Sequence, residues 1–309
     1  MNSIRLKIIL GLILSTSLSL TGYGQEFTAD EDGVLLSDKG QKIFYYQAKT
    51  KSLNGTYPRA NYLHPLYGLD GQILTEDFPA DHLHHRGIFW AWHQLYAEGE
   101  RLGDAWACDG ISWEMEDLKH KAKSGKARIK VSLYWVGELK GQQQRIVKEE
   151  TTITYYSTGL DYREIDFEIS LTALKEGVKI GGSEDVKGYS GFSARLKLPE
   201  DLSFQADKGE VQPVNTAVKA GGWMDISGTF NEESGKTGVT MICDMNTPIP
   251  FHGWILRNKG SMQNAAFPGR EPVDLEKGKK IILRYKLIIH PDGNYKDIIE
   301  QKYQEFNMN

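Results

Sequence analysis

Cysteine is scarce in this sequence, and an excess of basic residues is missing. Cys108 and Cys243 are the only two cysteines among 309 residues. Two cysteines cannot form a disulfide framework, although one bond between them is allowed in an oxidising compartment. The 37 lysines and arginines are outnumbered by 41 aspartates and glutamates, which argues against the clustered positive charge that nucleic-acid binding requires. The sequence therefore predicts no nucleic-acid partner.

Long apolar runs are also missing beyond the first 24 residues. The chain begins with a short basic stretch, an apolar run over residues 8–20 and small residues up to Gly24. This pattern is typical of a secretory signal, and the run is too short to span a membrane as a helix. No cysteine near Gly24 could accept a lipid anchor. We therefore expect a signal peptide over 1–24 and a mature chain, 25–309, that is periplasmic or secreted and not membrane-spanning.

Apolar and polar residues alternate with a period of two in several segments. The pattern is clearest over 129–135, 163–171 and 281–289. This period is that of a half-buried β-strand, and the polar residues in between favour antiparallel sheets over a doubly wound parallel sheet. Glycine-rich stretches separate the strands, and long helical patterns are rare. Residues 25–309 are therefore predicted to form a single all-β domain, an antiparallel multi-stranded β-sandwich of the supersandwich kind.

One helix is predicted, at the C-terminal end. Apolar residues keep near-helical spacing over 295–306. Asp292 or Asn294 could cap its first turn, because short polar side chains accept hydrogen bonds from free backbone N–H groups. We expect this short helix to pack against the edge of the sandwich.

Histidines gather in and around the stretch DHLHHRG, residues 81–87. Five of the eight histidines fall within thirty residues, namely His64, His82, His84, His85 and His93. If the stretch is extended, His82 and His84 point to one face and His85 points away. Such a pair could bind a metal or share proton transfer.

A metal site would need more than this pair. His82, His84 and Asp81 could ligate one divalent ion, with His64 or His252 supplying another ligand, since neutral imidazole is the commonest side-chain ligand for zinc. Proton transfer needs only one or two histidines held close to a carboxylate or an arginine. The third possibility is that the imidazoles satisfy buried backbone groups.

For His93, which stands between Trp92 and Gln94, we expect this structural role. The density of histidines favours chemistry for the cluster as a whole.

Aromatic and basic residues elsewhere could line a sugar site. Trp106 and Trp113 lie in the polar, glycine-containing stretch GDAWACDGISWE, so either could stack on a sugar ring or pack in the core. Further candidates for substrate contacts follow in GYSGFSAR and FHGWILRNKG, namely Arg195, His252 and Arg257. For the two arginines, a surface salt bridge is the plain alternative.

Three motifs together resemble those of a known family. They are R-x-x-x-x-H-P-L-Y (Arg59, His64, Tyr67), D-H-x-H-H-R-G (Asp81 to Gly87) and W-x-x-R (Trp254, Arg257). The sequence thereby resembles the exported PmoA-like family, whose label "methane oxygenase PmoA" does not suit a chain without spanning helices. Leu83 stands where relatives often have proline. The resemblance implies a carbohydrate-active enzyme, similar to a dehydratase of uronic-acid oligosaccharides from ulvan.

The leading hypothesis is a lyase that removes water from a terminal uronic acid and leaves a 4,5-unsaturated sugar. The C5 proton is α to a carboxylate, so a cation must neutralise that carboxylate, a base must take the proton and an acid must protonate the leaving hydroxyl. Arg59 or Arg86 would bind the carboxylate, His64, His82 or His84 would be the base, and Tyr67 or a second histidine would be the acid. A bound divalent ion could replace the arginine.

Two other functions stay open. A sugar epimerase or mutarotase would pair a histidine acid with a carboxylate base such as Glu149 or Asp166. A non-catalytic carbohydrate-binding protein would need ring stacking and hydroxyl recognition, but several titratable imidazoles would then have no task. Product analysis separates the enzymes, because only elimination creates a conjugated chromophore.

Overall fold

The structure, a computed structural model, describes residues 24–159, 161–233, 235–247 and 251–308. The predicted signal peptide lies outside the described residues except for Gly24. Twenty-three strands and one helix are assigned, and the named strands pair with one another in antiparallel fashion. The predicted all-β, antiparallel fold with a C-terminal helix is therefore confirmed.

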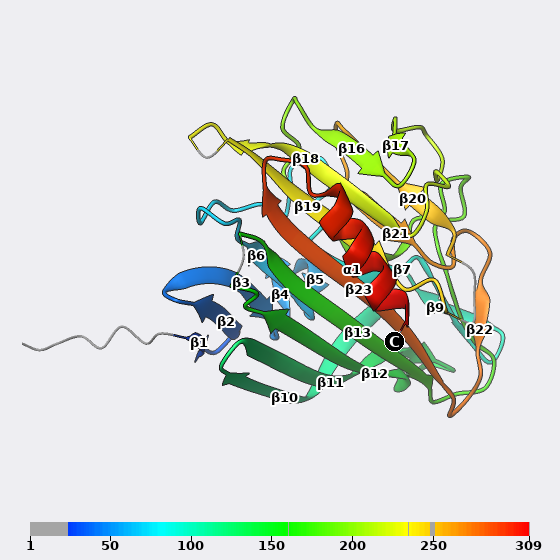
Figure 1. The fold of residues 1–309 in the computed structure, drawn as a ribbon. Helices are drawn as coiled ribbons and strands as arrows, with labels where there is room; N and C mark the ends of the chain where they lie inside the picture. The colour runs from blue at the N-terminus through cyan, green and yellow to red at the C-terminus, as the bar shows by residue number, and fades with distance from the viewer. Residues whose placement is uncertain (1–23, 160, 234, 248–250, 309) are drawn as a thin grey trace, which may run out of the picture.

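Two large sheets form the two layers of the sandwich (Figure 1). The eight-stranded sheet has the order β1 (Gln25–Ala29), β2 (Gly33–Asp38), β3 (Gln41–Gln47), β6 (Tyr62–Leu66), β7 (Ile88–Trp92), β15 (Ser190–Ala194), β21 (Gln263–Ala266), β20 (Gly253–Ile255). The nine-stranded sheet has the order β10 (Ile111–Lys123), β11 (Lys126–Leu139), β12 (Gln142–Tyr156), β13 (Arg163–Ala173), β23 (Lys280–Pro291), β19 (Gly235–Cys243), β18 (Trp223–Asn231), β16 (Ser203–Ala206), β17 (Gly209–Glu210).

Two smaller sheets extend this framework. One has four strands in the order β22 (Val273–Leu275), β14 (Val178–Gly181), β8 (Gln94–Ala97), β9 (Glu100–Gly103), and the other is the hairpin of β4 (Lys51–Leu53) and β5 (Thr56–Arg59). They matter for function because β5, β8 and β9 carry or adjoin candidate residues.

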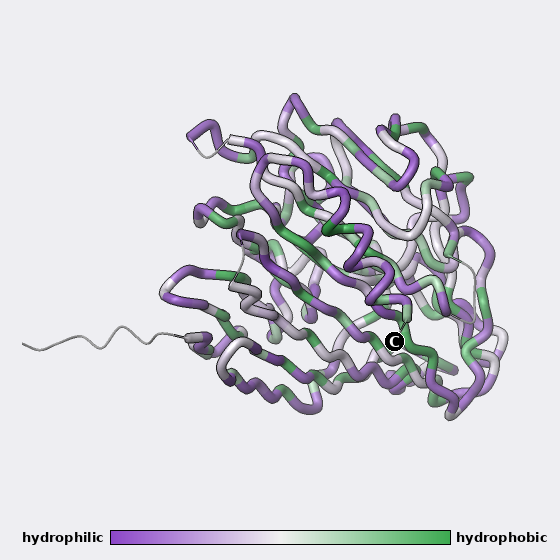
Figure 2. Tube along the Cα trace, viewed as in Figure 1, coloured by the Kyte–Doolittle hydropathy of each residue, from purple (hydrophilic) through white to green (hydrophobic). Residues whose placement is uncertain are grey.

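The main core lies between the two large sheets, and period-two alternation builds it. In β11, Ile129, Val131 and Leu133 are buried, while Arg128 and Lys130 are exposed. Figure 2 shows the same mixture of hydrophilic and hydrophobic residues along the long strands. The three segments in which alternation predicted strands correspond to β11, β13 and β23. Burial of these apolar faces is the dominant favourable term in folding.

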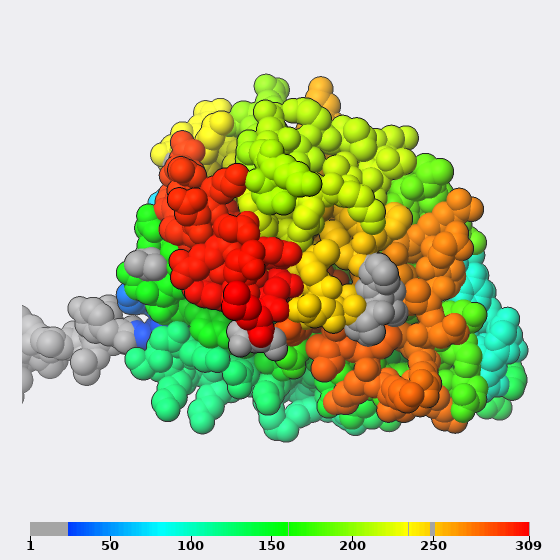
Figure 3. Space-filling view, turned by 45° about the vertical axis from the view of Figure 1, so that its right-hand side comes forward, coloured from blue at the N-terminus to red at the C-terminus, as the bar shows by residue number. Residues whose placement is uncertain are grey.

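The C-terminal helix α1 (Lys296–Met308) lies across the outer face of the nine-stranded sheet (Figures 1 and 3). Its buried Ile299 joins a second apolar cluster with Trp223 of β18 and Ile288 of β23. The side chain of Asn294 accepts a hydrogen bond from the Lys296 N–H at 3.3 Å, so of the two candidates, Asp292 and Asn294, it is Asn294 that contacts the first turn. None of the helices in the described part of the chain has the length and apolar character needed to cross a membrane.

A buried ion pair lies next to this helix. His290 is 3 % exposed, its Nε2 lies 3.0 Å from an Asp225 carboxylate oxygen, and its Nδ1 lies 2.8 Å from the Pro291 carbonyl. Both neighbours are acceptors, so both ring nitrogens must donate and the imidazole is charged. Gly238 has no room for a side chain because the His290 ring covers it. Burial lowers the pKa of His290, but the bond to Asp225, its negative charge and the bond to the Pro291 carbonyl together outweigh burial, and the net pKa is raised.

We expect this pair to make stability depend on pH on the alkaline side. Because the pKa of His290 is raised in the folded state, the protonated imidazole stabilises the fold. This contribution is fully present at pH values below 6.5, the ordinary pKa of histidine, and it is lost as the pH rises through the folded-state pKa of His290. Urea unfolding between about pH 6 and pH 9 should show the free energy of unfolding falling in this window. His290→Gln should be less stable by about 3 kcal/mol at pH 6 and should lose that slope. Identical slopes in the two proteins would contradict the assignment.

Candidate active site

The candidate site lies on the face of the eight-stranded sheet that points away from the main core. Along β7, Trp90 and Trp92 belong to the main core, whereas Phe89 and Ala91 belong to a separate apolar cluster. Alternation of side chains along a strand puts the two pairs on opposite faces. His93, directly after β7, continues the alternation of Phe89 and Ala91 on the outer face. The loops before β7 and after β9 cover this outer face, because His85 and Trp106 pack there against Phe89.

The DHLHHRG stretch is a pair of turns, so the condition under which His85 would point away, an extended backbone, is not met. The His82 N–H donates to the Pro79 carbonyl at 3.0 Å, and the His85 N–H donates to the His82 carbonyl at 2.9 Å. These short-range bonds curl the backbone. His85 therefore does not point away from the others: its ring stacks on that of His82, with centroids 4.5 Å apart and planes 2° apart. His84 meets His85 edge to face, with centroids also 4.5 Å apart.

This arrangement does not fit the predicted metal site. In the described part of the chain, no three His, Cys, Asp or Glu side chains are placed to hold one ion. The Asp81 carboxylate is already occupied by hydrogen-bond donors. The three imidazoles are therefore better suited to proton transfer than to ligation.

Ion pairs of the buried Arg195 with two partly exposed carboxylates anchor the histidine turns to the sheet. Arg195 of the strand-end after β15 is 4 % exposed and donates to both carboxylate oxygens of Asp81, at 2.7 and 3.0 Å. It also pairs with Glu76 at 2.8 Å. Burial is the largest single effect and would raise the pKa of Asp81, but the hydrogen bonds from Arg195, His82 and the Ser261 N–H together outweigh it and the net pKa is lowered. Arg195 has thus no capacity left for a substrate, which corrects its prediction as a substrate contact.

Arg86 is likewise a structural residue. Its side chain has no exposed surface, and it donates to the carbonyls of Leu83, His85 and Tyr57 at 2.5–2.9 Å. The guanidinium lies over the Phe78 ring at 3.5 Å, and Nε lies 3.3 Å from Asp77. The charge of Arg86 is thus already paired with the Asp77 carboxylate and its terminal nitrogens are used by backbone carbonyls, so the predicted contact role of Arg86 is not supported.

Arg59 differs from both of these arginines because no carboxylate pairs with it. It is 1 % exposed and lies between the rings of Phe89 and Trp113, at 4.7 and 4.9 Å. One terminal nitrogen donates to the carbonyls of Ala105 and Trp106 at 2.7 and 2.8 Å, while Nε has no hydrogen-bond partner. Among the ion pairs of the described residues, none includes Arg59. Carbonyl oxygens and ring faces surround its positive charge, but no carboxylate of the described residues neutralises it.

Arg59 and burial together set the charge state of His84. Burial is the larger cause and the charge of Arg59 the second, and they lower the pKa of His84 to about 4. Burial also lowers the pKa of His85, which is 2 % exposed and whose Nδ1 has no hydrogen-bond partner. Both imidazoles are hence neutral at neutral pH and can accept a proton.

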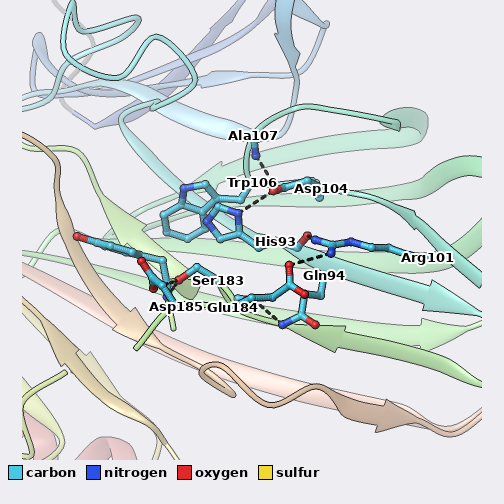
Figure 4. Close-up of polar contacts among 12 residues, drawn as sticks. His93, Gln94, Arg101, Asp104, Trp106, Ala107, Ser183, Glu184 and Asp185 are labelled. Carbon is cyan, nitrogen blue, oxygen red and sulfur yellow. Dashed lines mark hydrogen bonds and ion pairs between the residues drawn. The ribbon is translucent and has the colours of Figure 1, made fainter. Parts of the chain in front are cut away.

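His93 forms a second carboxylate-linked imidazole on the same face. Its Nδ1 lies 2.7 Å from Asp104, and its ring stacks on Trp106 with centroids 5.1 Å apart (Figure 4). The expectation that His93 satisfies buried backbone is not met, because its partner is a carboxylate and its side chain is one-fifth exposed, at 20 %. Trp106 is only 2 % exposed, so it forms the floor beneath His93 and His85 and offers no free face to a sugar.

Two predicted catalytic residues lie elsewhere. His64 contacts Thr75, with Nδ1 and Oγ1 3.0 Å apart, and lines a different surface cleft of about 630 Å³ with Lys51. Burial lowers the pKa of His64 to about 4. Tyr67 lies below the Lys42 ammonium group, 5.8 Å from it, and its carbonyl accepts a bond from Arg163. Neither residue makes a ring contact with the histidine turns, so their predicted roles as base and acid are not supported.

Of the two remaining predicted substrate contacts, Arg257 lies at the border of the site and His252 does not. His252 packs against Gly269, and its carbonyl accepts a bond from Lys219; burial lowers its pKa. Arg257 lies at the border of the site, because its guanidinium is 5.6 Å from the ring of Tyr189, which in turn packs on Trp106. It also donates to backbone carbonyls, including that of Val214 at 2.9 Å.

The carboxylates required by an epimerase lie outside this site. Glu149 is 1 % exposed and accepts four hydrogen bonds in the main core, from Asn61, Trp90, Trp135 and Thr151 at 2.7–2.8 Å. Burial raises the pKa of Glu149. Asp166 pairs with Lys286 at 2.6 Å on the nine-stranded sheet. Neither can serve as a base beside the histidines. Cys108 and Cys243 are both free, so the disulfide that the sequence allowed is not formed.

Asp104 and Tyr189 are the residues of the site that sequence reasoning missed. Asp104 lies in the stretch GDAWACDGISWE, of which only the tryptophans were singled out, and its partner His93 stands eleven positions earlier, across the β8–β9 hairpin. Tyr189 was noted only as part of GYSGFSAR, where its alternation with Phe192 on β15 could have placed it on the outer face.

Comparison with known proteins places the chain in a family. Residues 33–304 match the family model DUF6807, described as a family of unknown function. The chain belongs to DUF6807. No curated protein matches the DUF6807 chain. A solved structure described as a putative kojibiose phosphorylase from human microbiome is similar, with 13 % identity and a TM-score of 0.34; the match covers 92 % of this chain and 33 % of that one. The chain thus spans about one third of that protein's length.

Proposed function

We propose that this DUF6807 protein is a carbohydrate-active lyase that removes water from a terminal uronic acid of polysaccharide-derived, ulvan-like oligosaccharides. The observation that carries the proposal is Arg59, a buried guanidinium without a carboxylate partner among the described residues, beside imidazoles that are neutral. An isolated buried charge is costly, so its retention favours a role in binding an anion. A planar guanidinium suits a carboxylate in particular.

The chemistry of elimination fits this pair of groups. Neutralising the substrate carboxylate makes the C5 proton removable, and a neutral imidazole such as His84 can take that proton. When a carboxylate binds to Arg59, it also cancels part of the positive field that lowers the pKa of His84. Substrate binding would therefore make His84 a stronger base at the moment when a base is needed.

The remaining expectations follow the same proposal. An oligosaccharide substrate suits an exported protein, which is what the apolar run in residues 1–24 indicates. The site residues need no metal, because Arg59 takes the place of a divalent ion as carboxylate partner. The epimerase alternative is less well supported, because its two candidate carboxylate bases lie away from the histidines. Glu149 lies in the main core and Asp166 lies on the nine-stranded sheet.

The test is incubation of the purified protein with a panel of saturated uronic-acid oligosaccharides, followed by mass spectrometry and near-ultraviolet absorbance. We expect one member to lose the mass of one water and to gain the chromophore of an unsaturated uronic acid. The same panel reduced to neutral sugars at the terminal carboxyl should give no product, because Arg59 then has no anion to bind. Binding without turnover across the panel would favour a carbohydrate-binding protein instead.

A further inference from the structure

The environment of His93 is that of a group held ready for proton transfer. His290 in the same chain shows how a structural histidine looks: it is 3 % exposed and both ring nitrogens are bonded. His93 is 20 % exposed, only Nδ1 is bonded, and Nε2 has no hydrogen-bond partner among the described residues. An exposed, unpartnered nitrogen opposite a carboxylate-bound one is the arrangement that proton-transfer histidines require.

Asp104 is held in place by its own loop. One carboxylate oxygen accepts from His93 and the other accepts from the Ala107 N–H at 2.8 Å. Reciprocal backbone bonds at 2.8 and 2.9 Å join Asp104 to Asp109 and close the loop. Because Asp104 accepts at Nδ1, that nitrogen carries a proton in both charge states of the ring, whereas Nε2 accepts a proton in the neutral ring and donates one only in the imidazolium, the form that acts as an acid. The stack on Trp106 fixes the plane of the ring.

The charged groups around His93 come from several elements. Asp104 follows β9, Arg101 of β9 donates to the His93 carbonyl at 3.4 Å, and Glu184 of the loop after β14 pairs with Arg101 at 2.8 Å (Figure 4). His84 packs edge to face on His85, and both His85 and His93 pack on Trp106, whose carbonyl accepts a hydrogen bond from Arg59. Two imidazoles on different loops therefore belong to one aromatic cluster next to Arg59.

We propose that His93, oriented by Asp104, is the acid that protonates the leaving hydroxyl in the elimination, a step that rests on the proposed function. His84 takes the C5 proton, the C–H electron pair forms the C4–C5 double bond, and the C4–O bond breaks. The departing oxygen takes the proton from Nε2 of His93 and leaves as water. His84 then carries one extra proton and His93 lacks one, and exchange with solvent restores both.

The test compares His93→Gln, Asp104→Asn and the control His120→Gln on the substrate found in the panel. His120 is exposed on β10, against Phe27, and belongs to the other sheet. We expect His93→Gln to lower kcat by about 10²–10⁴-fold with little change in KM. Asp104→Asn removes the negative charge beside the acid, so the alkaline limb of its pH–rate profile should move to lower pH. His120→Gln should behave as wild type.

Three outcomes distinguish the role of His93 as the acid from the proposed lyase function. If wild type eliminates water but His93→Gln keeps full kcat and an unmoved alkaline limb, the assignment of His93 is overturned and the lyase stands. If the activity of the variants falls by the same factor at every pH and their melting temperature falls as well, His93 has a structural role and the assignment is also overturned. If wild type turns over no member of the panel, the proposed function fails and the role of His93 fails with it.

Discussion

Arg59→Met should remove turnover of uronic-acid substrates and leave the protein folded. The variant loses the cation that would bind the carboxylate, so kcat/KM should fall by about 10²–10³-fold, as when one preorganised electrostatic donor is removed. Stability should change little, because two effects oppose each other. The two bonds from Arg59 to the carbonyls of Ala105 and Trp106 are lost, but an unpaired charge no longer has to be buried.

The measurement pairs steady-state kinetics with urea unfolding. Arg145→Met is a matched control, since Arg145 is exposed on β12 and pairs with Glu114, away from the histidines. The control should keep full activity and change the free energy of unfolding by less than about 0.5 kcal/mol. Normal kcat/KM in Arg59→Met would show that the buried guanidinium does not bind substrate.

Arg86→Met should have the opposite signature, a large loss of stability. Arg86 ties the histidine turns and the β4–β5 hairpin together through three backbone carbonyls, and its removal leaves Asp77 with only the half-exposed Lys51 as ion-pair partner. Breaking a buried pair costs about 3–5 kcal/mol, so the midpoint of urea unfolding should fall accordingly.

A second variant makes the origin of that loss testable. Asp77→Asn in the Arg86→Met background removes the stranded carboxylate and should recover part of the stability. Residual activity should follow the folded fraction in both proteins. An Arg86→Met protein as stable as wild type but inactive would restore Arg86 as a substrate residue and would count against the structural role.

The fold followed from local sequence patterns to a large extent. Alternation over 129–135, 163–171 and 281–289 predicts strands because each of these segments buries one face against the core, and burial acts residue by residue. The terminal helix followed from spacing and from Asn294 for the same reason. The order of the strands in each sheet could not be read, because pairings such as β7 with β15 join residues about one hundred positions apart.

The site was predictable in composition but not in geometry. The density of histidines indicated the region in which the candidate site lies, and Arg59 was named among the candidates. Which arginine is free depends on where carboxylates lie: Asp77 neutralises Arg86 and Asp81 neutralises Arg195, and both pairings are tertiary contacts. The assumption that 81–87 is extended put His85 on the wrong side because backbone bonds inside the segment form turns instead.

The four bonds to Glu149 have a consequence for how the sandwich assembles. Asn61 and Trp90 approach the carboxylate from the segment of the eight-stranded sheet, and Trp135 and Thr151 approach from the nine-stranded sheet. All four donors meet only when the two sheets have docked in one register, so a shifted docking would enclose an acidic group short of partners. Such misdocked compact states are raised in free energy by the desolvation of the Glu149 carboxylate, so they are populated less during folding. Glu149 thus favours the native alignment of the two sheets over shifted ones. Its replacement by an apolar residue should slow the final docking of the sheets more than the formation of either sheet.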